Sequence, residues 1–190
     1  MLARTLRIVA VVLTALIGFV ATAFVVGETF DDPGGMTAVG LSAAWVVPML
    51  ALVLLVLWRP DLATWLLPAL TAVVAVFVLL DASLGLVPRD VGPLDGLLVL
   101  VLAVPTGLLG WRRPRLAGFS LVAMSVLLLV ASALTRTGAP LTAILGGSSG
   151  VLVLPLLLVG GLLVLAWLLE SPEPHEPQGR VRPPAGTTTG

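Results

Sequence analysis

The residues that could carry chemistry are few in this chain. It contains one histidine, His175, and no cysteine. A lone histidine in a proline-rich stretch cannot form a catalytic triad, a facial metal site or a haem clamp. Without cysteine there is no disulfide, thiol chemistry or iron–sulfur cluster. We therefore expect no catalytic residue, no cofactor-binding residue, no metal ligand set and no cofactor, and we expect that the protein is not an enzyme.

Phosphate-binding and metalloprotease motifs are also missing. The sequence has no GxxxxGK[ST], no HExxH and no DxDxDG pattern. Glycine pairs occur at 34–35, 146–147 and 160–161. None of them follows a strand and opens a helix, which is the context in which a glycine-rich loop holds phosphate.

Acidic residues near the ends of apolar segments offer one alternative site. They are Glu28, Asp31, Asp32, Asp81, Asp90 and Asp95. Ca²⁺ takes about six to eight oxygen ligands from a shaped loop, and the stretch 31–35, DDPGG, is the densest candidate. No spacing rule of a calcium loop is satisfied, so solvated outer loops are the default interpretation.

The composition places the chain in a membrane. It is 58% hydrophobic and 11% charged, with a mean hydropathy of +1.15, whereas soluble domains carry about 25% charged residues. Six apolar spans are predicted, at 6–26, 36–57, 62–80, 94–110, 116–134 and 151–169. Because lipid offers the backbone no hydrogen-bond partner, each should be a helix. The fourth span is the weakest, since Asp95 lies in its first turn, and a re-entrant segment is its alternative.

These spans predict an all-α polytopic membrane protein, with six transmembrane helices arranged as three helical hairpins. Residues 1–169 would form one transmembrane domain, and residues 170–190 a short disordered tail. The tail segment PEPHEP has a PxxP spacing that would suit a polyproline II ligand, but a plain linker is the simpler interpretation.

Arginine placement predicts the orientation. Eight arginines fall on one side of the predicted membrane: Arg4, Arg7, Arg59, Arg112, Arg113, Arg115, Arg180 and Arg182. Only Arg89 and Arg136 fall on the other side. The positive-inside rule makes the first side cytoplasmic, with both termini there. Lys, Asn and Tyr, whose codons are AT-rich, are absent, so we expect a high-GC bacterium and its cytoplasmic (inner) membrane.

Two similar turns, WRPDLATW at 58–65 and WRRPRLAG at 111–118, join predicted spans on the cytoplasmic side. Proline ends one helix and can open the next, and tryptophan favours headgroup depth. We expect Arg112, Arg113 and Arg115 to contact anionic lipid headgroups, each worth about 1 kcal/mol. The bilayer is thus the predicted partner; a membrane-protein partner cannot be named, and the zero net charge gives no reason to expect nucleic acid.

A repeat is suggested by the three predicted hairpins. Each begins with Leu-Ala, at residues 2, 62 and 116, and each ends at a tryptophan, at residues 58, 111 and 167. Each second helix contains a proline, at 48, 105 and 155. Transporters contain such repeats, but sequences rich in Leu, Ala and Val also resemble themselves by chance. A true repeat and a chance similarity therefore both stay open.

The first 24 residues resemble a secretory signal, with an Ala-x-Ala site at 21–23. The apolar stretch at 8–26 is longer than the usual ~7–15 residues of such a signal. We therefore expect an uncleaved first helix.

Small and hydroxyl residues recur at helical spacing within the spans. The sets are Gly118, Ser125 and Ser132; Thr14, Gly18 and Thr22; Gly40 and Ala44; and Thr64 and Thr71. Such faces permit close helix contacts, and hydroxyls can bridge helices. We expect the first set to face another helix, and Leu127, Leu128 and Leu129 to be reached by lipid.

No span interior carries a charge, which disfavours coupled transport through a buried carboxylate. The leading interpretation is a non-enzymatic scaffold or accessory membrane component. The alternative is a carrier or channel for an apolar or lipid-like solute. Helix breaks at Pro48, Pro68, Pro105 and Pro155 could then expose backbone carbonyls.

Overall fold

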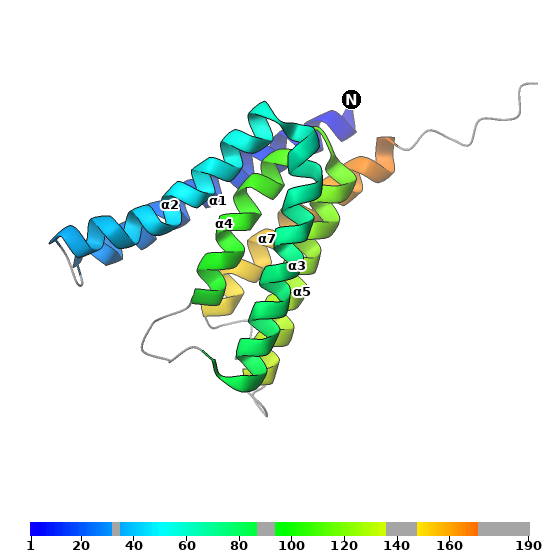
Figure 1. Cartoon of the computed structure of the whole chain (residues 1–190). Coiled ribbons are helices and arrows are strands. Elements are labelled where there is room, and N and C mark those ends of the chain that lie inside the picture. Colours follow the sequence, from blue (N-terminus) through cyan, green and yellow to red (C-terminus); the bar gives the residue numbers. More distant parts are fainter. Residues whose placement is uncertain (32–34, 87–93, 136–147, 171–190) are drawn as a thin grey trace, which may run out of the picture.

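The protein is an all-helical membrane protein, as the sequence predicts. The computed structural model describes residues 1–31, 35–86, 94–135 and 148–170, and that part of the chain contains helices and no strand. The helices are α1 (Leu2–Asp31), α2 (Gly35–Trp58), α3 (Pro60–Leu84), α4 (Leu94–Leu109), α5 (Pro114–Thr135) and α7 (Ser148–Glu170) (Figure 1). Each coincides with one predicted span, so the predicted order of elements is confirmed.

Five of these helices are long and apolar enough to cross a membrane, and α4 is the shorter one. With 16 residues, α4 rises about 24 Å, which is less than the ~30 Å of a hydrocarbon core. Its place in the bundle explains how it tolerates this length. It packs against all five other helices described, and nearly every residue from Val99 to Gly110 is buried. Protein rather than lipid therefore surrounds the weakest predicted span.

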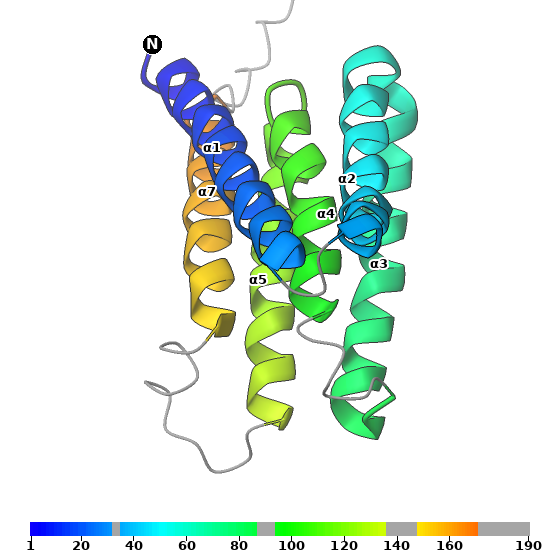
Figure 2. The same cartoon turned by 90° about the vertical axis from the view of Figure 1, so that its left-hand side faces the viewer.

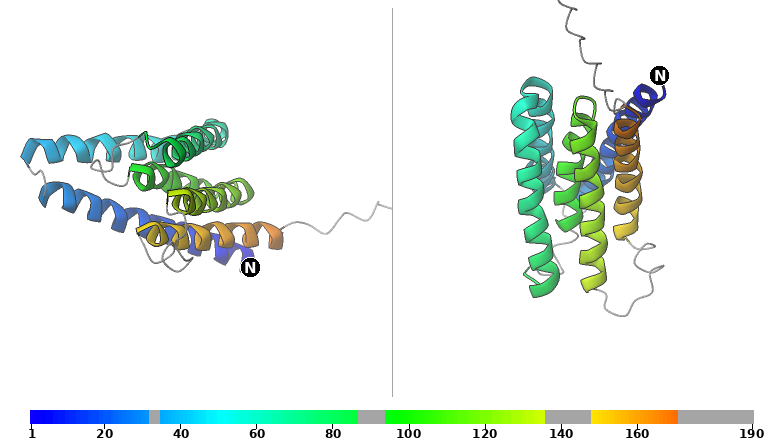
Figure 3. Two further views of the ribbon diagram at one scale, coloured as in Figure 1. Left: turned by 90° about the horizontal axis from the view of Figure 1, so that it is seen from below. Right: turned by 90° about the vertical axis from the view of Figure 1, so that its right-hand side faces the viewer.

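The helices form three layers of two. Seen from below, α2 lies with α3, α4 with α5, and α1 with α7 (Figure 3). The first two layers are closed by the turns that contain Trp58 and Trp111. The third is formed by the first and last helices of the chain. The two helices of each hairpin predicted from the sequence also contact each other: α1 with α2, α3 with α4, and α5 with α7. These hairpin contacts run between layers rather than within one.

The α1–α2 pair runs obliquely to the rest of the bundle. On the side away from the two arginine–proline turns, the two helices extend away from α3, α4, α5 and α7 as a projecting arm (Figures 1 and 2). The buried share is 17% for α1, α2 and α3 alike, compared with 39% for α5. We use the term arm for residues 19–31 of α1 and 35–47 of α2.

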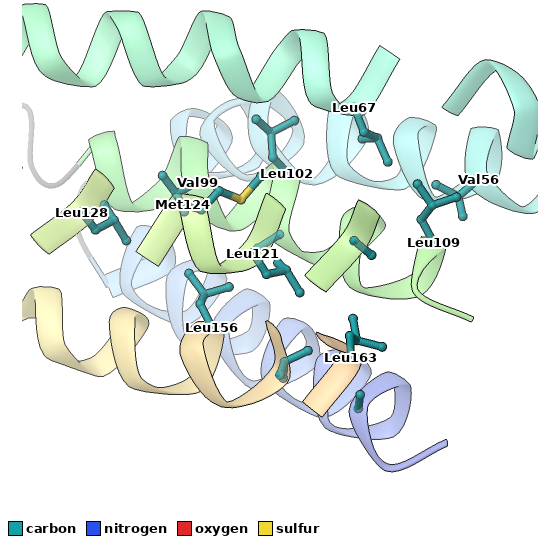
Figure 4. Packing of buried hydrophobic residues seen from close by; sticks show 14 of the residues in the cluster. Val56, Leu67, Val99, Leu102, Leu109, Leu121, Met124, Leu128, Leu156 and Leu163 are labelled. Atoms are coloured by element: carbon teal, nitrogen blue, oxygen red, sulfur yellow. The ribbon is translucent and has the colours of Figure 1, made fainter. Parts of the chain in front are cut away.

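The hydrophobic core lies around α4 and α5. Leu102 and Leu109 of α4 and Leu121 and Met124 of α5 lie between α3 on one side and α7 on the other (Figure 4). Leu128 of α5, only 5% exposed, belongs to the same cluster. The expectation that lipid reaches Leu128 is therefore wrong. The reason is that α5 contacts α3, α4 and α7, which leaves it only a narrow lipid-facing strip.

Both arginine–proline turns end one helix and start the next within a few residues. Arg59 is the N-cap of α3, with Pro60 at the first helical position and no side-chain cap. In the other turn the N–H groups of Arg112 and Arg113 both donate to the carbonyl of Leu109, and α5 then begins at Pro114. Proline suits this position because its missing N–H would have no partner there.

Candidate functional site

Close helix contacts in the interior involve glycines. A Cβ built at Gly118 of α5 would lie 2.9 Å from the Val164 nitrogen of α7, and one at Gly160 would lie 3.1 Å from the Val122 nitrogen. The two backbones thus meet reciprocally, and α5–α7 is the most extensive helix pair in the structure. Ser125 is fully buried and Ser132 is 9% exposed. The prediction that Gly118, Ser125 and Ser132 lie on a buried helix face is confirmed.

A second close contact joins α1 and α4 at the bundle centre. Thr14 lies over Gly107, and Gly18 lies against Val104. A cavity of about 10 Å³ adjoins this crossing and is lined by Thr14 and by apolar side chains of α1, α4, α5 and α7. This volume is at the lower limit for a single water molecule, and the cavity therefore has no room for a solute.

Hydroxyl groups in the spans bond mainly to their own helix. Each of five donates to the carbonyl four residues earlier: Thr14 to Ala10, Thr22 to Gly18, Thr64 to Pro60, Thr71 to Leu67 and Ser125 to Leu121. The expectation of hydroxyl bridges between helices is not met at these residues. The preceding carbonyl is within easy reach of a helical Ser or Thr side chain, which can bond to it without a partner on another helix.

Thr106 of α4 differs from those five residues. Its side chain is fully buried, and its Oγ1 has no hydrogen-bond partner in the part of the chain that the structure describes. It directly follows Pro105, which lacks an N–H and so leaves the carbonyl of Val101 without its helical donor. The C-terminal half of the central helix thus contains a break in its hydrogen bonding within an apolar interior.

The small residues of α2 are not packed as the sequence predicts. Gly40 and Ala44 are exposed, and a Cβ built at Gly40 would meet nothing within 4 Å. Both lie on the arm. Their four-residue spacing places both on one helix face, as the seven-residue spacing does for Gly118 and Ser125, but here no described helix covers the face.

At the arginine-rich end of the bundle, Arg7 of α1 contacts both α7 and the α4–α5 turn. Its Nη2 forms an ion pair with Glu170 at the end of α7, and its Nη1 lies 3.5 Å from the carbonyl oxygen of Trp111 in the α4–α5 turn. Both side chains of the ion pair are partly exposed. Sequence reasoning placed both residues on one side of the membrane but did not pair them, because their partnership depends on α1 packing against α7.

The three arginines predicted to contact lipid divide into two kinds. The Arg115 guanidinium lies 4.9 Å from the centre of the Trp167 ring, which Phe119 contacts edge-on at 6.1 Å. Arg112 and Arg113 are exposed and have no ion-pair partner among the residues that the structure describes. Around the same end, Trp58, Trp65 and Trp111 are 76%, 82% and 48% exposed, as interfacial residues should be.

The acidic candidates lie mostly outside the described side chains. Of the six, only the side chain of Asp81 is described, at the C-terminal end of α3, where it has a polar interaction. The hypothesis of a cation site at 31–35 therefore falls outside the described residues, as do His175 and the tail. Within residues 1–31, 35–86, 94–135 and 148–170, the side chains described include no cluster of three potential metal ligands. No family model, curated protein or solved structure matches this chain.

Proposed function

We propose that this protein is a non-enzymatic scaffold or accessory component of a bacterial inner membrane. The observation that supports this proposal is the packing of α4. The central helix is enclosed by all five other helices described, and the cavity beside it measures about 10 Å³. A carrier needs room for its solute between the helices, whereas a scaffold needs only a rigid body and an outward surface.

The arm supplies such a surface. Phe19 and Phe24 of α1 and Met36, Val39 and Leu41 of α2 are exposed to between 47% and 85%. In a membrane these side chains face lipid or another membrane protein. Because the arm extends away from the bundle, its helices are accessible from more sides than α5 or α7, which suits lateral contact.

The orientation proposed for this role has both termini in the cytoplasm. It rests on the eight-to-two division of arginines and on the positive-inside rule. The described arginines of the majority side, Arg4, Arg7, Arg59, Arg112, Arg113 and Arg115, lie at the end of the bundle that holds both turns, which supports a single assignment for all of them.

Site-specific photo-crosslinking in native membranes tests the scaffold role. A photoreactive residue at Phe19 or Val39, on the arm, should give one discrete protein adduct. The same residue at Leu158, which is 55% exposed on α7, is the matched bundle control and should give lipid adducts only. The arm adduct should also disappear in a variant with Phe19→Ala and Phe24→Ala.

A carrier would behave differently. Proteoliposomes of the purified chain should then exchange a fluorescent phospholipid between vesicles or leaflets faster than empty vesicles. Such exchange, together with lipid-only adducts along the arm, would replace the scaffold role with the carrier alternative.

A further inference from the structure

The charged groups at the arginine-rich end are unevenly distributed. Four elements lie at this end: the start of α1, the α2–α3 turn, the α4–α5 turn and the end of α7. Among the residues that the structure describes, five arginines and one carboxylate lie around α1, the α4–α5 turn and α7. The arginines are Arg4, Arg7, Arg112, Arg113 and Arg115, and the carboxylate is Glu170. We call this group the α1–α5–α7 junction.

Arg7 makes the junction a cluster rather than a loose group of arginines. Its guanidinium contacts both Glu170 and the carbonyl of Trp111. Trp111 directly precedes Arg112, so α1 brings its own cation against the turn that carries Arg112 and Arg113. Glu170 balances Arg7, while the Trp167 ring covers Arg115. Arg4, Arg112 and Arg113 keep their charge without a described counter-ion.

The α2–α3 turn provides the contrast. It carries a single arginine, Arg59, and Asp61 follows two residues later in the first turn of α3. Its formal charge is therefore zero, although its Trp-Arg-Pro sequence resembles the Trp-Arg-Arg-Pro of the α4–α5 turn. The α2–α3 turn is a single residue between its helices and the α4–α5 turn has four, and the two turns also differ in their attraction for anions.

We propose that the α1–α5–α7 junction binds the phosphodiester headgroup of an anionic phospholipid, with Arg112 and Arg113 as the groups that donate to the phosphate. Guanidinium groups match phosphate oxygens with two parallel N–H donors. Exposed Trp111 marks headgroup depth beside them, so a phosphate at this level belongs to lipid. Arg7, held by Glu170, is a positioning residue for the turn. The proposal requires only that the bundle is embedded in a membrane, and it does not depend on the scaffold role.

Native mass spectrometry of the full chain, released from a mild detergent, tests this site. The probes are phosphatidylglycerol and phosphatidylcholine of identical acyl chains, added separately. We expect phosphatidylglycerol to remain bound preferentially. Replacing Arg112 and Arg113 together by Gln should lower that retention by roughly tenfold or more, because each arginine contributes separately to the attraction. Arg112→Gln and Arg113→Gln singly should each give part of the loss.

Arg59→Gln is the matched control at the other turn and should leave lipid retention unchanged. The variants are compared only where circular dichroism and gel filtration match the parent protein. Arg112→Lys with Arg113→Lys keeps the charge but removes the paired donors, and should retain less lipid than the parent. Inorganic phosphate alone, followed by its effect on the thermal midpoint, should not stabilise the protein.

Three results would overturn the proposal. They are equal retention of the two lipids, an equal loss with Arg59→Gln, and stabilisation by inorganic phosphate of the same size as that by phosphatidylglycerol. The first would mean that the arginines set orientation only, the second that the effect is general surface charge, and the third that the ligand is a free anion.

Discussion

Thr14 of α1 lies directly over Gly107 of α4, so closely that a Cβ at Gly107 would be 2.5 Å from the Thr14 hydroxyl oxygen. This contact is where the first helix meets the central one. Thr14 satisfies its own donor by bonding to Ala10 at 2.8 Å, so the crossing depends on the missing side chain at 107 rather than on a hydrogen bond between the helices.

Gly107→Ala should therefore destabilise the bundle. An added methyl group in a packed crossing costs typically about 1–3 kcal/mol, because either Thr14 or the backbone must move. Gly161→Ala is the control, since a Cβ there would meet nothing within 4 Å and alanine favours a helix over glycine. Unfolding of both purified variants in detergent should show a lowered midpoint for Gly107→Ala alone; equal midpoints would contradict the close crossing.

Ser125→Leu should also lower stability, by a similar ~1–3 kcal/mol. Ser125 is fully buried on α5, and the larger leucine side chain would clash with the helices packed around it. Its neighbour Val126 is 48% exposed, so Val126→Leu should be nearly neutral. The measurement is again the unfolding midpoint in detergent, and a harmless Ser125→Leu would show that this face of α5 is open.

Thr106→Val should raise stability or leave it unchanged. A buried hydroxyl without a partner costs about 1–3 kcal/mol, and valine has nearly the same shape without the polar group. Thr14→Val is the comparison, because Thr14 loses a hydrogen bond in the exchange and should gain nothing. If thermal unfolding shows that Thr106→Val is destabilising, the hydroxyl binds water or another polar group at the Pro105 break.

The ion pair between Arg7 and Glu170 should contribute modestly. Its side chains are 26% and 33% exposed, and such pairs are worth about 0.2–1 kcal/mol because water and salt screen them. Arg7→Glu and Glu170→Arg should each lower the thermal midpoint, and the double exchange should recover most of the loss. Recovery should shrink in high salt; no recovery in low salt would mean that the two residues do not pair in the membrane protein.

Topology reporters should place Gly35, Gly92 and Gly147 outside and fusions after Asp61 and Arg115 inside. The expectation follows from the arginine division. An outside signal at Gly92 together with an inside signal after Arg115 would show that α4 crosses the membrane despite its length. The same signal at Gly92 and after Arg115 would instead make α4 a re-entrant helix.

Much of the fold could be predicted from local sequence. Long uncharged apolar runs require helices in lipid, and the Trp-Arg-Pro turns mark where one helix ends and the next begins. The order of helices, the turns at one end and the buried face of Gly118, Ser125 and Ser132 all followed from residues close together in the chain.

The partners of each face were decided by tertiary structure. Gly40 and Ala44 have the small-residue spacing of a packed face but are exposed on the arm. Leu128 is a residue that lipid could contact equally well, but it is buried. Lipid tails are as apolar as leucine, so hydropathy cannot distinguish a lipid-facing side chain from one between helices. The central place of the short α4 and the pairing of Arg7 with Glu170 arise for the same reason: both depend on which helices pack together, and that choice is made by shape across the whole bundle.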